Sequence, residues 1–299
     1  MALLKFLETI RSPFLDVIIE TITRFGEETI IMLVICAIYW CINKKVAYII
    51  GIAFFFSGLT VQGMKICFRI DRPWVIDTTL SPIPAAMKQA TGYSFPSGHT
   101  QSAASFYGSL GAVFKRKSLK AACIAIVILV AFPRLYLGVH TLVDVAVSII
   151  ISFLLIFITT KILSDSQLNR KKEFLIALVM VLYSIAAIVV AMILYSSGKI
   201  EQTYVSDCLK AAGAGVGFSI GMYIERVYID FPTAAKTVLM QILKLLLGLA
   251  GIIVIKEGIK LVMGIGLVID TIRYFMMPIW LTVAYPLIIK RFFRLQNVG

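Results

Sequence analysis

Long apolar runs separated by short polar connections dominate the chain from about residue 28 onward. A helix of about 20 apolar residues is long enough to cross the hydrocarbon core of a bilayer, so the pattern predicts one membrane-spanning helix after another. The runs that fit lie at residues 28–43, 46–65, 98–114, 119–137, 141–163, 173–196, 207–225, 236–255 and 262–289. We therefore predict an all-α fold, a polytopic integral membrane helical bundle of about nine transmembrane helices.

Residues 1–26 follow a different pattern, in which apolar positions recur every three or four residues with charged residues between them. That period is typical of an amphipathic helix that lies in the membrane interface. The apolar positions are Leu3, Leu7, Ile10, Phe14, Ile18, Ile22 and Phe25.

The composition agrees with a membrane protein and argues against a soluble domain. Of the 299 residues, 60% are hydrophobic and 15% are charged, whereas a soluble domain averages about 45–50% and about 25%. The net charge of +13 would suit nucleic acid, but the basic residues lie in short runs between apolar segments, so we expect no nucleic-acid partner. They are better suited to setting topology and contacting anionic membrane lipids.

The polar residues that interrupt the apolar pattern gather in three clusters, at residues 65–73, 93–99 and 133–144. Lys65, Arg72 and Arg134 offer two planar guanidinium groups and one point charge, which suits a phosphate dianion. His99 and His140 are the chain's two histidines, and they can supply a nucleophile and a proton donor. On a continuous helix, Lys65 and Arg72 would share one face and reach the same phosphate.

The second and third clusters carry local arrangements that suit this chemistry. Ser97 is a good helix cap, and Gly98 lets backbone N–H groups approach an anion at the start of a helix. His140 and Asp144 are spaced i, i+4, so the carboxylate can accept from one ring nitrogen and leave the other free to attack. Taken singly, each is more often a turn, a cap or a structural polar contact. Charges inside apolar spans favour function.

Together the clusters resemble the signature of the type 2 phosphatidic acid phosphatase superfamily. That signature reads Lys, six residues, Arg-Pro; then Pro-Ser-Gly-His; then Ser-Arg, five residues, His, three residues, Asp. The sequence departs from it at Pro133, where the family usually has Ser beside Arg134. The resemblance covers about residues 46–150 and says nothing of residues 165–299.

The resemblance implies a phosphatase that needs no metal or cofactor. In it His140 would form a phosphohistidine, Asp144 would orient the ring, and His99 would protonate the leaving oxygen. The residues expected to hold the phosphoryl oxygens are Lys65, Arg72, Ser97, Gly98 and Arg134. Taken with the pattern of spans, we expect three parts of the chain: an amphipathic segment (residues 1–26), a PAP2-like catalytic transmembrane core (27–163) and carboxyl-terminal transmembrane helices (164–299).

Alternating topology places the three clusters on one membrane face, because they follow the second span, open the third and join the fourth to the fifth. The connections on the other face carry more than half of the 29 lysines and arginines. By the positive-inside rule that face is cytoplasmic, so we predict a cell-membrane protein with an extracytoplasmic site.

A site at the membrane rim favours a lipid phosphate or diphosphate of polyprenyl, phosphatidate, phosphatidylglycerophosphate or sphingoid type. One alternative is a soluble sugar phosphate, as in glucose-6-phosphatase, which shares a nine-span layout. Another is a transporter-like membrane protein on an inactive core, suggested by the extra spans. The segment from Asp71 to Tyr93 is either a substrate-access rim or a passive connector.

The carboxyl-terminal spans show two further patterns. Gly213, Gly217 and Gly221 line one helix face and allow close helix contact, within the chain or, less favoured, across a homodimer seam. Asp270 and Arg273 are spaced i, i+3, and we expect them to pair with each other.

Overall fold

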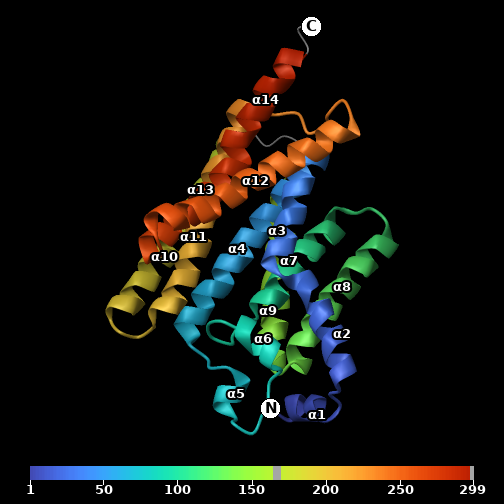
Figure 1. Ribbon diagram of the computed structural model, residues 1–299, viewed down its shortest axis with the longest axis vertical. Helices are drawn as coiled ribbons and strands as arrows, with labels where there is room; N and C mark the ends of the chain where they lie inside the picture. The colour runs from blue at the N-terminus through green and yellow to red at the C-terminus, as the bar shows by residue number, and fades with distance from the viewer. Residues whose placement is uncertain (164–169, 297–299) are drawn as a thin grey trace. The chain divides into compact units, whose positions relative to one another are not determined.

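The computed structural model describes residues 1–163 and 170–296 (Figure 1). Over these residues the protein is helical and has no β-strand, which confirms the predicted all-α class. Two compact units are present: Met1–Met32 with Ile52–Ile162, and Leu33–Gly51 with Leu163–Gly299. The domain boundary predicted at residue 164 falls on residues 164–169, outside the described residues.

The first unit contains the three polar clusters. Its helices are α1 (Ala2–Thr9), α2 (Pro13–Thr23), the first half of α3 (Glu28–Ala37), the second half of α4 (Lys44–Phe68), α5 (Pro73–Ile76), α6 (Pro84–Gln89), α7 (Gly98–Val113), α8 (Lys117–Tyr136) and α9 (Leu142–Leu163). Helices α7 and α2 both pack against α8. This packing brings the starts of α7 and α9 together with the end of α8.

The amphipathic segment is two helices, so the prediction of one helix over residues 1–25 is wrong. The helical path breaks between Ile10 and Ser12. Ser12 caps α2 by accepting from the Leu15 N–H at 3.4 Å, and Pro13 occupies the first helical position. A proline there starts a helix readily but has no N–H to continue a preceding one.

Among the described residues, six helices are long and apolar enough to cross a membrane. A seventh span is present if the bent pair Pro13–Gly26 and Glu28–Ile42 counts as one. Helix α7, with 16 residues, is shorter than a bilayer requires. Helix α11 (Gln202–Ile224) carries Asp207 and Lys210 in its first half. The predicted count of nine is therefore not confirmed.

The second unit also contains α10 (Arg170–Ser196), α12 (Val238–Met263), α13 (Leu267–Ile279) and α14 (Tyr285–Gln296). The break before the last span lies at residues 264–266, so its predicted position near residues 256–261 is wrong. Lys256 and Glu257 do not end α12; Gly264 does, because its φ of +81° suits a glycine at a helix end.

The predicted close packing along the glycine face of α11 is confirmed within the chain. A Cβ on Gly213 would lie 2.5 Å from the Thr271 carbonyl oxygen, and one on Gly217 would collide with the Phe275 carbonyl. Both carbonyls belong to α13, so the glycines let the two backbones approach closely. The ion pair predicted from Asp270 to Arg273 also forms, with 2.7 Å between Oδ1 and Nη2.

Candidate active site

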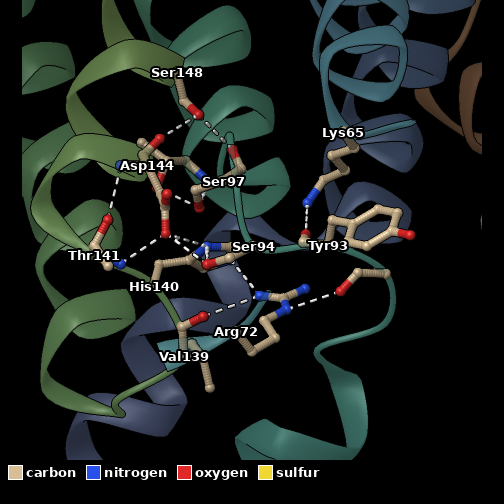
Figure 2. A network of polar contacts seen from close by, with 12 residues as sticks. Lys65, Arg72, Tyr93, Ser94, Ser97, Val139, His140, Thr141, Asp144 and Ser148 are labelled. Carbon is tan, nitrogen blue, oxygen red and sulfur yellow. Dashed lines mark hydrogen bonds and ion pairs between the residues drawn. The ribbon is translucent and has the colours of Figure 1, made fainter. Parts of the chain in front are cut away.

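The first cluster is not one continuous helix, so Lys65 and Arg72 do not share a helix face as their spacing would allow. Helix α4 ends at Phe68, and Arg69 has a left-handed φ of +52°. Arg72 then occupies the N-cap position of α5, before Pro73. Lys65 and Arg72 nevertheless converge on the segment that opens the second cluster (Figure 2).

Arg72 holds the second and third clusters together. Its guanidinium donates to the carbonyl oxygens of Thr91 at 2.7 Å, Gly92 at 3.0 Å and Val139 at 3.0 Å. Its Nη1 also lies 2.9 Å from Nε2 of His140. One planar cation thus fixes the two segments and faces one imidazole nitrogen.

These contacts determine the form of the His140 ring. Because a guanidinium only donates, Nε2 must accept and carry no proton, which places the ring proton on Nδ1. Burial lowers the pKa of His140 well below its usual range, and the charges of Arg72 and Arg134 lower it further. The ring is therefore neutral, and the Nε2 lone pair that a nucleophile would use accepts from Arg72.

Asp144 lies on the Nδ1 side of the His140 ring, in the first turn of helix α9. Its Oδ2 lies 3.5 Å from Nδ1 of His140, and it accepts from the Ser94 hydroxyl at 2.6 Å and the Thr141 N–H at 2.7 Å. Thr141 accepts in turn from the Asp144 N–H, which makes a reciprocal helix cap. The predicted pair is brought together, with Ser94 bonded to the same carboxylate oxygen. The sequence interpretation did not include Ser94, whose only signal is its place in the second cluster.

The start of α7 is joined to the start of α9. The N–H of Ser97 donates to the Asp144 carbonyl at 3.1 Å, while the Ser148 hydroxyl bonds both the Ser97 and the Asp144 carbonyls, at 2.9 and 2.8 Å. Ser97 caps α7 by accepting from the Thr100 N–H. Beyond its chain neighbours and its own helix backbone, no described residue has an atom within 4 Å of the position of a Cβ on Gly98, so Gly98 borders open space.

Two buried side-chain nitrogens of the site have no hydrogen-bond partner among the described residues: Nε2 of His99 and Nε of Arg134. Buried polar groups are normally satisfied, so an unpaired pair of this kind favours a ligand. Arg134, Arg72 and Lys65 lie near enough to His99 and His140 to act on both rings electrostatically. An anion with several oxygens fits these donors.

The segment between the first two clusters, residues 71–93, is built against the third. Ala86 of α6 packs with Leu137 and Val139 in one buried apolar cluster. The Ile83 N–H donates to the Leu137 carbonyl at 3.1 Å. The segment therefore packs against the third cluster, and its role as a substrate-access rim stays a prediction.

The fold and the site together define a class of protein: a helical membrane protein with a buried candidate anion site built around two histidines. The family profile described as "PAP2 superfamily" matches residues 45–168. A second, described as "PAP2 superfamily phosphatase, transmembrane extension", matches residues 209–297. The chain belongs to the PAP2 superfamily and is a membrane phosphatase of that superfamily.

One known sequence and one solved structure, both from Bacillus subtilis, are similar to this chain. Phosphatidylglycerophosphatase B of strain 168 is 29% identical over 190 residues, which cover 58% of this chain and 86% of that protein. The crystal structure titled as a transmembrane PAP2 type phosphatidylglycerolphosphate phosphatase is 23% identical, with a TM-score of 0.48. It covers 56% of this chain and 85% of the solved chain.

Proposed function

We propose that the protein hydrolyses a lipid phosphate or diphosphate on the extracytoplasmic face of the cell membrane, through a phosphohistidine on His140. The observation that carries the proposal is the unprotonated Nε2 of His140, held 2.9 Å from Arg72. The similarity to phosphatidylglycerophosphatase B supports a lipid phosphate and makes phosphatidylglycerophosphate the first substrate to test.

In the first step, Nε2 of His140 attacks phosphorus, and the bond from phosphorus to the leaving oxygen breaks. His99 is protonated when the charge of the bound phosphate offsets the burial and nearby cations that lower its pKa to about 3. It then donates this proton to that oxygen, and the alcohol departs. Asp144, near Nδ1, stabilises the positive charge that the phosphorylated ring carries. In the second step, water attacks phosphorus while His99 takes its proton, and inorganic phosphate leaves the restored imidazole.

The cations around the rings stabilise the charge that spreads over the phosphoryl oxygens during both steps. Arg72 borders the attacking nitrogen, and Arg134 keeps an unpaired Nε. The first backbone N–H groups of α7, beside Gly98, can add donors from a helix start. Catalysis of phosphoryl transfer is mostly positioning and electrostatic stabilisation, which these groups supply.

The direct test measures phosphate release by purified protein from a panel of substrates. Phosphatidylglycerophosphate, phosphatidate, a polyprenyl diphosphate and a sphingoid phosphate represent lipids, and glucose 6-phosphate represents soluble esters. We expect release from at least one lipid phosphate, with inhibition by vanadate as a phosphate mimic. Preferential release from glucose 6-phosphate would favour the sugar-phosphate alternative, and no release from any substrate would favour the transporter-like alternative.

Activity is expected to survive EDTA. Among the residues that the structure describes, no three His, Cys, Asp or Glu side chains are arranged to hold a metal ion, and the proposed steps use only histidines and fixed cations. The measurement compares phosphate release before and after chelation. Loss of activity that Mg²⁺ restores would contradict the proposed chemistry.

Ser94→Ala is expected to lower turnover about tenfold. The Ser94 hydroxyl is fully buried and donates to Asp144, and losing a hydrogen bond to a charged group costs about 1.5–3 kcal/mol. Ser102→Ala is the matched control, because that buried hydroxyl has no partner among the described residues. Equal turnover in the two variants would show that Ser94 does not position the Asp144 carboxylate.

A cysteine at Lys88 is expected to react with an impermeant reagent added outside intact cells, whereas one at Lys117 is not. Both positions are exposed. Lys88 lies in α6 and Lys117 begins α8, and Figure 1 shows α6 at the opposite end of the first unit from the connection between α7 and α8. Cys67 is the exposed native cysteine, so Cys67→Ser provides the background. The reverse labelling pattern would overturn the extracytoplasmic orientation of the site.

A further inference from the structure

Helix α1 lies across the end of the first unit that carries the site, below α2 and α8 in Figure 1. Its charged residues contact the segment between α5 and α6. Nζ of Lys5 lies 2.8 Å from Oδ2 of Asp77, and Oε1 of Glu8 accepts from the Ser81 N–H at 3.1 Å. Arg11, just after the helix, donates to the Ser81 carbonyl.

Arg11 also contacts the catalytic loop, which we define as residues 136–140. Its Nε donates to the Tyr136 carbonyl at 2.9 Å, and its guanidinium lies 5.9 Å from the centre of the Tyr136 ring. Its Nη2 would lie 2.9 Å from a Cβ on Gly138, a residue that has a φ of +75°. A single guanidinium therefore joins residues 77–83, the rim segment, to the loop that carries His140.

The face of α1 away from Lys5 and Glu8 is apolar and exposed. Phe6 is 61% exposed, and Leu3 and Ile10 are exposed beside it. This face continues onto α2, where Phe14 is 75% exposed and Val17 is 65% exposed. The bent helix pair that contains α2 is a candidate membrane span, and an exposed apolar helix face beside a span is typical of a helix that lies in the membrane interface.

We propose that α1 is a strap that couples the lipid surface to the active site. Its exposed apolar face rests in the bilayer interface, and its polar contacts hold the rim segment against the catalytic loop. Arg11 is a positioning residue, since it acts on His140 through the loop backbone. The effect on catalysis rests on the proposed function, whereas the two physical contacts can be measured without any substrate.

The contact with the rim segment is tested by amide hydrogen exchange in lipid nanodiscs. In Arg11→Ala, the amides of Ser81 and Ile83 are expected to exchange about tenfold faster or more, because local opening frees them. Arg11→Lys should give an intermediate rate. Arg24→Ala is the matched control, since Arg24 is exposed and its nearest carboxylate is 4.0 Å away.

Unchanged exchange at Ser81 and Ile83 in Arg11→Ala would overturn the strap. Glu8→Ala gives a second, independent reading, because it removes the acceptor of the Ser81 N–H. Exchange in α12, in the other unit, should stay the same in every variant and reports that the protein is folded.

The lipid contact is tested with a nitroxide at Phe6→Cys in the Cys67→Ser background, in vesicles. We expect it to be more accessible to oxygen, which partitions into lipid, than to a water-soluble nickel chelate. The same label at Lys88→Cys serves as the reference in water. Equal nickel accessibility at both positions would overturn the proposal.

The catalytic consequence is tested with two substrates. Arg11→Ala should lower kcat about tenfold on both a lipid phosphate in vesicles and soluble p-nitrophenyl phosphate, because a misplaced nucleophile affects every substrate. Phe6→Ser should lower turnover of the vesicle lipid alone. If both variants keep wild-type turnover on both substrates, α1 does not act on the site. If the wild type hydrolyses neither substrate, the proposed function fails, and the exchange and nitroxide measurements still decide whether the strap exists.

Discussion

His140→Ala is expected to abolish phosphoenzyme formation with every substrate and to lower turnover by about 10⁴-fold or more. The reason is that Nε2 of His140 is the unprotonated nitrogen beside Arg72, and the substitution removes the only atom proposed to bond phosphorus. The measurement is phosphate release in steady state together with alkali-quenched labelling by a substrate that carries radioactive phosphate.

His140→Gln is the control that separates chemistry from structure. Its amide can still accept from Arg72, so the loop that Arg72 holds should stay in place while the nucleophile is absent. Both variants should therefore be inactive, with His140→Gln nearer the wild type in thermal stability. A phosphoenzyme that still forms in either variant would show that another residue is the nucleophile.

His99→Ala is expected to lower hydrolysis of an ester with an alcohol leaving group by on the order of 10²–10⁴-fold, because it removes the proton donor. A leaving group that departs without a proton, such as p-nitrophenolate, should lose much less. The measurement is kcat on a lipid phosphate and on p-nitrophenyl phosphate, in the wild type and the variant.

The role of His99 is assigned from the ratio of the two losses in kcat, because a general disturbance of the site would slow hydrolysis of both substrates alike. Phosphoenzyme should still form from p-nitrophenyl phosphate in His99→Ala, unlike in His140→Ala. Equal losses on both substrates would mean that His99 binds phosphate or holds the structure instead of donating a proton.

The helical class followed from the apolar runs because hydrophobic length depends on local sequence alone. The glycine face of α11 was also predictable. Residues four apart lie on the same face of a helix, and glycines at that spacing leave the face without side chains. Helix ends were less predictable. The span predicted over residues 236–255 stops short of the end of α12 at Met263, and the left-handed turn at Arg69 has no glycine to mark it.

The chemical residues of the site were predictable from their types and spacing, but their supporting contacts were not. Ser94 reaches Asp144 across 50 positions, and Arg11 reaches Tyr136 across 125. Such contacts depend on how helices pack, which no local pattern records. The family match at residues 209–297 was likewise unforeseen, because that region has no polar cluster comparable to the three of the site.

The most direct test of the central claim is to trap the covalent intermediate. Purified wild-type protein is mixed with a phosphate-labelled lipid substrate, quenched within milliseconds in alkali, digested and analysed by mass spectrometry. The account predicts a phosphate that is stable in alkali, labile in acid and located on the peptide containing His140. A label on another residue, or rapid turnover with no labelled protein at any time, would contradict it.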